Sequence, residues 1–368
     1  MQEPRILVVA QTPPPFHGQA VMQKYLVDAT WTWCKKVFVR MNFSEEIGEV
    51  GVFKFKKVRE LFGLLNRVRQ SKQARFDLAY YPPAGPNRIP IYRDIIILFY
   101  LRLASKKIIL HFHAGGIDQI FRKVSRPEAF LIKRMFRKVD AAIVLSDRLK
   151  QEVQWCLPKQ TFVVGNGIDD VFEEFSGKPK QEMTTFLFVG NLKKEKGIFT
   201  FLKAALILKK MRVQCAIKFI GAFHSENEKQ HFFSFIDEHN LTGYVEYLGP
   251  KSGREKWKEF QKASVFCLPT FETEGMPVSI LEAMMFQLPV ITTDWRGIPD
   301  LIRHGENGLL FKPQNEEELA ACMKQLAESE SDRVRMGAQA RKDFLQNYTV
   351  AQHLINMENV FKQVAADN

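Results

Sequence analysis

Short apolar runs rich in β-branched and aromatic residues alternate along the chain with segments in which apolar residues recur at helical spacing. Pro, Gly, Ser or Asn bounds each run, so we interpret the runs as buried strands. The strands predicted in the first part of the chain are 5–10, 76–81, 107–113, 141–146 and 161–164. Those predicted in the second part are 185–189, 216–221, 245–248, 265–268 and 290–293. Alternating strands and helices predict parallel sheets covered by helices on both faces.

The two series of strands are separated by a stretch rich in Gly, Pro and Lys at residues 176–179. Because 368 residues exceed a typical single α/β core, we predict two domains, 1–175 and 176–348. A final helical segment, 349–368, has a domain membership that the pattern leaves open. The predicted fold class is α/β, with two Rossmann-like, doubly wound parallel sheets facing each other across a cleft. Ligands of such sheets bind beyond the carboxyl ends of the strands.

The most informative motif follows the predicted strand 265–268 and runs from Glu274 to Glu282, with the sequence EGMPVSILE. We predict a helix that begins near residues 277–279, because Pro is tolerated in the first turn of a helix. The free N–H groups and positive dipole end of that turn suit an anionic phosphate. The two carboxylates could accept hydrogen bonds from sugar and ribose hydroxyls. Spacing alone is equally consistent with a helix cap and a solvated surface residue.

With its surroundings, this motif resembles family 4 of the retaining GT-B glycosyltransferases, the group 1 type of bacterial polysaccharide and lipopolysaccharide biosynthesis. The resemblance continues through 288–294 (LPVITTD), 297–300 (GIPD) and 304–310 (HGENGLL). Upstream, 188–197 (FVGNLKKEKG) resembles the phosphate-binding loop of the family. The resemblance covers almost all of the second domain and is highly specific in combination.

The resemblance implies that the second domain binds a nucleotide-sugar donor. Glu274 would hold hydroxyls of the donor sugar, Glu282 would bind the nucleotide ribose, and Lys196 would neutralise the diphosphate. The backbone that would lie near sugar and phosphate is that of Gly275, Met276, Pro277 and Val278. The resemblance implies no metal and no cofactor, since the nucleotide sugar is itself a substrate.

Two positions depart from the family pattern. An Arg usually follows the glycine of the phosphate loop, and Asn191 occupies that place here. Because a departing diphosphate needs its charge matched, a second cation is still expected, and Lys193 is a candidate. The alternative is that Lys193 and Lys194 form a solvated charge run. Gln287 stands where the family commonly has Gly, which puts the local loop geometry in question.

The first domain carries weaker motifs, and the resemblance implies that it binds the acceptor. Residues 12–20 (TPPPFHGQA) resemble the first glycine-containing loop of the family, which faces the donor diphosphate, and Gly18 is the matching residue. A strict G-x-G-x-x-G is absent, which argues against a NAD dehydrogenase. His113 matches a family histidine close to the donor sugar and the reaction centre. His111 stays an alternative, because residues two apart on a strand point to the same face.

No metal or disulfide site is predicted. Residues 166–169 (NGID) match an interdomain element of the family, to which we assign a role in shaping the hinge and the base of the cleft. The adjacent acids Asp169 and Asp170 could be mistaken for metal ligands, but the resemblance implies that cationic side chains and helix ends replace a divalent ion. The five cysteines are dispersed and form no C-x-x-C pair, which suits a reducing cytoplasm.

The net charge of +12 is concentrated in the first half of the chain. Residues 1–175 contain 28 Lys and Arg against 17 Asp and Glu, and the remainder contains 25 against 24. This asymmetry predicts an anionic partner for the first half. The basic stretches are 53–75 and 121–138, and the first has the pattern of an interfacial helix on anionic lipid. The alternative is an ordinary amphipathic helix with a solvated basic face, and no motif supports nucleic-acid binding.

The resemblance implies a retaining hexosyltransferase that moves sugar from a nucleoside diphosphate sugar, such as a UDP- or GDP-sugar, to a hydroxyl of a glycan or lipid-linked acceptor. Its catalytic residues would be His113, Glu274 and Lys196. We expect a cytoplasmic protein, peripheral on the inner face of the cytoplasmic membrane. One alternative is a catalytically silent GT-B module that binds a sugar nucleotide or a membrane partner, which the missing loop Arg favours. Another is a nucleotide-sugar epimerase, against which the Glu274–Glu282 context argues.

Overall fold

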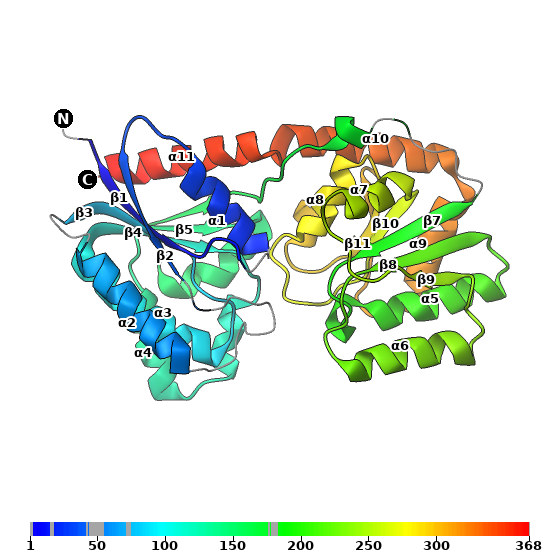
Figure 1. Cartoon of the computed structure of the whole chain (residues 1–368), viewed down its shortest axis with the longest axis horizontal. Helices are drawn as coiled ribbons and strands as arrows, with labels where there is room; N and C mark the ends of the chain where they lie inside the picture. Colours follow the sequence, from blue (N-terminus) through cyan, green and yellow to red (C-terminus); the bar gives the residue numbers. More distant parts are fainter. Residues whose placement is uncertain are drawn as a thin grey trace. The chain divides into compact units, whose positions relative to one another are not determined.

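The structure of the chain is a computed structural model that describes residues 3–14, 18–41, 43, 55–70, 75–175, 177 and 183–367. The chain divides into two compact units, one of Met1–Gly167 with Val350–Asn368 and one of Ile168–Thr349. Each unit is built on a parallel sheet of six strands with helices on both faces (Figure 1). The predicted α/β class with two doubly wound parallel sheets is therefore confirmed.

The strands of the first sheet lie in the order β2-β1-β3-β4-β5-β6. They are β1 Arg5–Ala10, β2 Lys35–Arg40, β3 Phe76–Tyr81, β4 Ser105–Phe112, β5 Ala141–Val144 and β6 Gln160–Val163. The helical segments are α1 Gly18–Asp28, α2 Phe55–Gln70, α3 Arg88–Ala104, η2 Ile117–Arg122, α4 Arg126–Phe136 and η3 Asp147–Cys156. The last helix, α11 Val350–Ala366, returns to this unit and contributes Met357, Val360, Phe361 and Val364 to its core. Figure 1 shows α1 and α11 on one face of the sheet and α2, α3 and α4 on the other.

The strands of the second sheet lie in the order β12-β11-β10-β7-β8-β9. They are β7 Thr184–Val189, β8 Cys215–Ile220, β9 Val245–Tyr247, β10 Val265–Leu268, β11 Val290–Thr293 and β12 Gly308–Phe311. The α-helices are α5 Ile198–Lys210, α6 Glu226–Glu238, α7 Gly253–Lys262, α8 Val278–Met285, α9 Glu316–Glu328 and α10 Glu330–Asn347. Short 3₁₀ segments are η4 Phe172–Phe175, η5 Lys194–Lys196 and η6 Ile298–Asp300.

Two strands of these sheets, β2 and β12, are missing from the strands predicted from sequence, and both lie at a sheet edge. Strand β2 is only partly buried and carries three basic residues in six, so it lacks the continuous apolar run of a buried strand. Strand β12 is buried, but only the short η6 separates it from β11. The alternation of strand and helix used for the prediction is absent at that point.

Helix α2 packs its apolar side inward. Leu64, Leu65 and Val68, which the sequence offered as part of a lipid-facing surface, are buried. Residues 53, 54 and 71–74 of the same basic stretch lie outside the described residues. For this described part, the structure therefore agrees with the alternative, an amphipathic helix that covers its own sheet. No helix among the described residues is both long and apolar enough to cross a membrane.

The chain passes from one unit to the other at two neighbouring points. Ile168 and Thr349 form an isolated parallel bridge, and the Ile168 N–H donates to the carbonyl of Tyr348 at 3.0 Å. Next to this bridge, both carboxylate oxygens of Asp170 accept hydrogen bonds of 2.8 Å from the Arg341 guanidinium. Asp170, one of the two adjacent acids for which the sequence predicts no metal, is therefore paired with an arginine. The hinge role assigned to residues 166–169 stays a prediction.

Candidate functional site

The loop between β7 and α5 is anchored at both ends by its neighbours. The Gly190 N–H donates to the carbonyl of Ile220 at 3.0 Å, and the Leu192 N–H donates to the carbonyl of Ala222 at 2.8 Å. At the far end Gly197 has a φ of 80°, in the left-handed region, and a Cβ there would lie 1.9 Å from the carbonyl oxygen of Pro269. Glycine is therefore required twice over, by the conformation and by the close approach.

We expect Gly197→Ala to destabilise the fold far more than a substitution that meets the conformational cost alone. Gly243 is the matched control, because its φ is 81° and a Cβ there would meet nothing within 4 Å. Gly243→Ala should cost about 1–2 kcal/mol of unfolding free energy, and Gly197→Ala should cost about 4 kcal/mol or more. Urea denaturation of both variants measures the difference. Equal shifts in the two midpoints would show that the close approach to Pro269 is easily relieved.

Four charged side chains meet at the carboxyl ends of β7 and β10. Lys196 Nζ contacts Glu274 Oε1 and lies 3.3 Å from Glu272 Oε2, and Lys193 Nζ contacts Glu272 Oε1. The side chains of Lys196 and Glu274 are only 17% and 16% exposed. Of these residues, Lys193, Lys196 and Glu274 were predicted from sequence. Glu272 was missed, although it lies only two residues before the motif.

Burial and neighbouring charges act in opposite directions on the pKa values of Lys196 and Glu272. Burial lowers the pKa of Lys196, and the charge of Glu272 opposes that shift. Burial acts to raise the pKa of Glu272, but Lys196 and Lys193 outweigh it, so the pKa of this carboxyl is lowered. The cluster therefore presents paired, partly desolvated charges to a ligand, and these interact more strongly than charges in water.

The loop that carries the two acids is fixed by its backbone. The Phe271 N–H donates to the carbonyl of Glu195, in the loop between β7 and α5, at 2.8 Å. The indole N–H of Trp295, from the loop after β11, donates to the carbonyl of Glu272 at 2.9 Å. Because loops from neighbouring strands hold each other in this way, the charged cluster is organised before any ligand arrives.

Helix α8 begins at Val278 with Pro277 as its N-cap, which confirms the predicted helix start. Gly275 and Met276, just before it, are buried. Glu282, inside the helix, is 7% exposed and pairs with Lys256 of α7 at 2.7 Å. Burial raises the pKa of Glu282, and the charge and hydrogen bond of Lys256 oppose that rise. Lys256 was not predicted, since a basic residue on an amphipathic helix carries no distinctive sequence signal.

Lys256→Met should make stability depend on pH through Glu282. Without its cation, the buried carboxyl has a pKa raised further above that of the unfolded chain, so the folded state holds its proton over a wider range. Stability then falls as pH rises through the interval above the ordinary value of 4.5. We expect a loss of about 3 kcal/mol at neutral pH and little loss in acid. Urea titrations across pH measure this, and adding Glu282→Gln should abolish the slope; a slope that survives would implicate another group.

Gln287 and Asn191, the two residues that depart from the family pattern, lie in different surroundings. Gln287 has a φ of 58°, so it takes the left-handed conformation that suits Gly. Asn191 is exposed, while Lys193 reaches into the charged cluster two residues later. Lys194 is exposed and does not join Lys193 in the cluster. The alternative of a solvated charge run therefore fits Lys194, whereas Lys193 is paired with Glu272.

In the first unit, the predicted histidine lies at the end of a buried polar chain. Gln23 Nε2 of α1 lies 2.7 Å from His113 Nε2 and donates to the Tyr80 hydroxyl at 3.0 Å, and that hydroxyl lies 2.7 Å from His111 Nδ1. The two imidazole rings are 3.9 Å apart, as expected for residues on one face. His111 is 1% exposed, and burial followed by the charge of His113 holds its pKa well below the ordinary value. The half-buried His113 is the more accessible of the two.

Gly18, the other predicted residue of this unit, is the first residue of α1. Residues 15–17 of the loop before it lie outside the described residues. The predicted function of this loop therefore stays a prediction.

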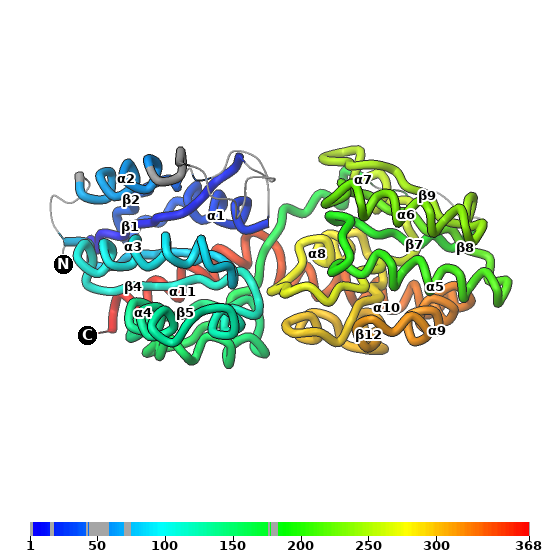
Figure 2. The backbone as a smooth tube through the Cα atoms, turned by 90° about the horizontal axis from the view of Figure 1, so that it is seen from below, coloured from blue at the N-terminus to red at the C-terminus, as the bar shows by residue number. Residues whose placement is uncertain are grey.

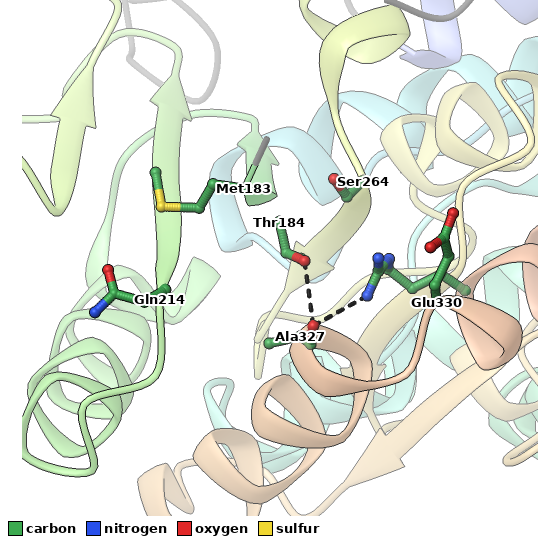
Figure 3. Close-up of a pocket in the computed structure, with 7 residues that line it drawn as sticks. Met183, Thr184, Gln214, Ser264, Ala327 and Glu330 are labelled. Carbon is green, nitrogen blue, oxygen red and sulfur yellow. Dashed lines mark hydrogen bonds between the residues drawn. The ribbon is translucent and has the colours of Figure 1, made fainter. Parts of the chain in front are cut away.

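A pocket in the second unit lies at the opposite ends of the strands, near the starts of β7 and β10 (Figure 3). Its lining residues are Met183, Thr184, Gln214, Ser264, Ala327, Glu330 and Arg333. The carbonyl of Ala327 accepts hydrogen bonds from Thr184 Oγ1 at 3.3 Å and from Arg333 at 3.1 Å. These contacts bind the end of α9 to the sheet, so we assign this pocket a structural origin.

Comparisons with known proteins agree with this picture of the second unit. Residues 170–343 match the family described as glycosyl transferases group 1. The putative colanic acid biosynthesis glycosyltransferase WcaL of Salmonella typhimurium is 27% identical over 282 residues, which are 74% of this chain and 66% of that protein. The amylovoran biosynthesis glycosyltransferase AmsK of Erwinia amylovora is 26% identical over 69% of this chain and 66% of its own length. The aligned part of the chain thus spans just under two thirds of these curated relatives.

Two solved structures resemble the chain over nearly its whole length. A sucrose-phosphate synthase from Thermosynechococcus elongatus has a TM-score of 0.74 at 15% identity and covers 99% of both chains. Anabaena HepE, solved in complex with UDP, has a TM-score of 0.71 at 14% identity, over 98% of this chain and all of the other. The GT-B fold predicted from the motifs is confirmed.

Proposed function

We propose that the chain is a retaining hexosyltransferase of the glycosyl transferases group 1 family, whose model matches residues 170–343. Its donor would be a nucleoside diphosphate sugar, and its acceptor a hydroxyl of a glycan or lipid-linked glycan. The relatives named for colanic acid and amylovoran support a role in bacterial exopolysaccharide biosynthesis.

One observation carries the donor assignment, the contact between Lys196 and Glu274. In a nucleoside diphosphate sugar, a single glycosidic oxygen joins the sugar ring to the diphosphate. A carboxylate that accepts from sugar hydroxyls and a cation that balances phosphate must therefore stand side by side. The preorganised cluster supplies both at the carboxyl ends of a parallel sheet, where ligands of such sheets bind.

The same geometry supports the remaining donor contacts that we propose. Glu282, kept in place by Lys256, would accept hydrogen bonds from the ribose hydroxyls. The first turn of α8, from Val278, would direct free N–H groups and a positive dipole end at phosphate. Lys193, beside Glu272, would supply the second cation in place of the Arg that Asn191 replaces.

In the proposed reaction, the bond between the anomeric carbon and the phosphate oxygen breaks as the acceptor oxygen forms the new bond on the same face of the sugar. The departing diphosphate takes the acceptor proton, so no protein nucleophile is required. Lys196 and Lys193 stabilise the charge that develops on the diphosphate, and Glu274 fixes the sugar. His113, steadied by Gln23, would contact the donor sugar near the reaction centre.

A thermal-shift screen against UDP-, GDP- and dTDP-sugars tests donor binding, because a ligand stabilises the state that it binds. We expect one nucleotide series to raise the melting temperature, and Glu282→Gln to diminish the rise. No shift with any of these sugars would contradict the donor assignment. The second candidate, a silent GT-B module, is favoured by Asn191 and would give the shift without consuming the donor.

A further inference from the structure

Helices α3 and α4 expose an unusual number of large apolar side chains. On α3, Ile89, Ile96, Phe99, Tyr100 and Leu103 are 51%, 40%, 52%, 37% and 54% exposed. On α4, Phe130 and Leu131 are 69% and 44% exposed. The spacing places the α3 residues on one outward stripe of the helix, away from buried positions such as Leu98 and Leu101. A stripe of this kind is more than the scattered exposed apolar residues of an ordinary surface.

The same surface is basic. Helices α3 and α4 contain six Lys and Arg against two Asp and Glu, and Arg88, Arg126, Lys133 and Arg134 are exposed. The two acids of α3 and α4 are already paired, Asp94 with Arg93 at 2.7 Å and Glu128 with Arg88 at 2.6 Å. On α4, Arg126 and Arg134 are exposed one turn to either side of Phe130. Apolar and cationic side chains therefore share one outward face.

Helices α3 and α4 form one continuous platform. The Arg88–Glu128 pair ties them at one end, and the Arg102 guanidinium donates to the carbonyl of Met135 at 2.9 Å at the other. Figure 2 shows α3 between α2 and α4 on the face of the first sheet opposite α11. The surface is thus held in shape without a partner.

We propose that the α3–α4 face docks the chain onto an anionic lipid surface. Large apolar side chains flanked by cations, as Phe130 is by Arg126 and Arg134, suit the boundary between acyl chains and negatively charged headgroups. A second copy of the chain is a poorer occupant, because two such basic faces would repel each other. The outward face of α3 and α4 would be the surface through which the chain contacts a membrane. This contact does not depend on the donor chemistry.

Vesicle co-sedimentation of the full chain tests this docking. We expect binding to vesicles of equal parts phosphatidylcholine and phosphatidylglycerol, weak binding to phosphatidylcholine alone, and loss of binding in high salt. Phe99→Gln with Phe130→Gln should lower the partition coefficient at least about tenfold. Arg126→Gln with Arg134→Gln should lower it about 25-fold.

The matched control for the apolar pair is Val334→Gln with Leu345→Gln, which are exposed apolar residues of the second unit. The matched control for the charged pair is Lys210→Gln with Lys258→Gln, which are exposed lysines of the same unit. The controls should bind vesicles like the unchanged chain. Equal losses in controls and test variants, or no binding to anionic vesicles, would overturn the proposal. So would a dimer in sedimentation analysis that the Phe variant dissociates, since a second copy would then be the occupant. Donor-induced thermal shifts of the same variants in solution report separately on the transferase assignment.

Discussion

Replacing Lys196 with Met is expected to lower kcat for sugar transfer by about 100- to 1000-fold. Lys196 lies between Glu272 and Glu274 and would meet the negative charge that builds on the departing diphosphate. Because the methionine side chain has similar length, the loss should come from charge rather than from packing. Steady-state transfer, or donor hydrolysis where no acceptor is known, measures the effect.

Lys194→Met is the matched control for this loss. Lys194 belongs to the same loop but is exposed and lies outside the charged cluster, so its replacement should leave kcat nearly unchanged. Lys196→Arg, which keeps the charge, should recover part of the activity. Equal losses from Lys194→Met and Lys196→Met would mean that the loop acts through its overall charge and not through a placed cation.

Glu274→Gln should cost about as much transfer activity, about 100- to 1000-fold, but with a different effect on binding. The substitution removes the carboxylate that would hold the sugar, and it also removes the group that contacts Lys196 in the free protein. The free nucleoside diphosphate should therefore bind as tightly as before or more tightly, while the intact nucleotide sugar loses its advantage. Calorimetric titration with each ligand separates the two effects.

Glu272→Gln provides the comparison for Glu274. Glu272 contacts both lysines but lies outside the motif, so its replacement should release the cations without removing the sugar contact. We expect a smaller loss of transfer than from Glu274→Gln. If the Glu272 variant proves the more damaging, the sugar-binding role belongs to Glu272 and the motif assignment is wrong.

Lys196 and Glu274 could be singled out from sequence because they lie in contiguous motifs with distinctive spacing. Glu274 and Lys196 are 78 residues apart, yet each follows a recognisable buried strand of one parallel sheet, and such strands present their loops at a common edge. The start of α8 was predictable for a local reason, since Pro277 marks a first helical turn.

Partners that come from other elements left no such signal. Lys256 reaches Glu282 from α7, and Gln23 reaches His113 from α1; both are polar residues on helices, and only the packing of the helix against the sheet selects them. For a related reason, the sequence of the basic stretch around α2 could not distinguish a helix that faces lipid from one that covers its own sheet. An apolar stripe looks the same whether it faces lipid or its own sheet, and Leu64, Leu65 and Val68 face the sheet.

The exposed α3–α4 face was not predicted from the sequence. Helix α3 is apolar over most of its length, so periodicity alone does not distinguish its exposed side from its buried side. Exposure of Phe99 and Leu103 emerges only when the neighbouring helices are in place. Burial, unlike periodicity, depends on the rest of the fold.

The central claim is that this chain transfers sugar from a nucleoside diphosphate sugar at the site of Lys196 and Glu274, with retention. Proton NMR of the purified chain with the nucleotide sugar that stabilises it most tests this directly. We predict release of nucleoside diphosphate and a first-formed sugar product of the same anomeric configuration as the donor, both lost in Glu274→Gln. A bound donor that is never consumed, or a product of inverted configuration, would contradict it.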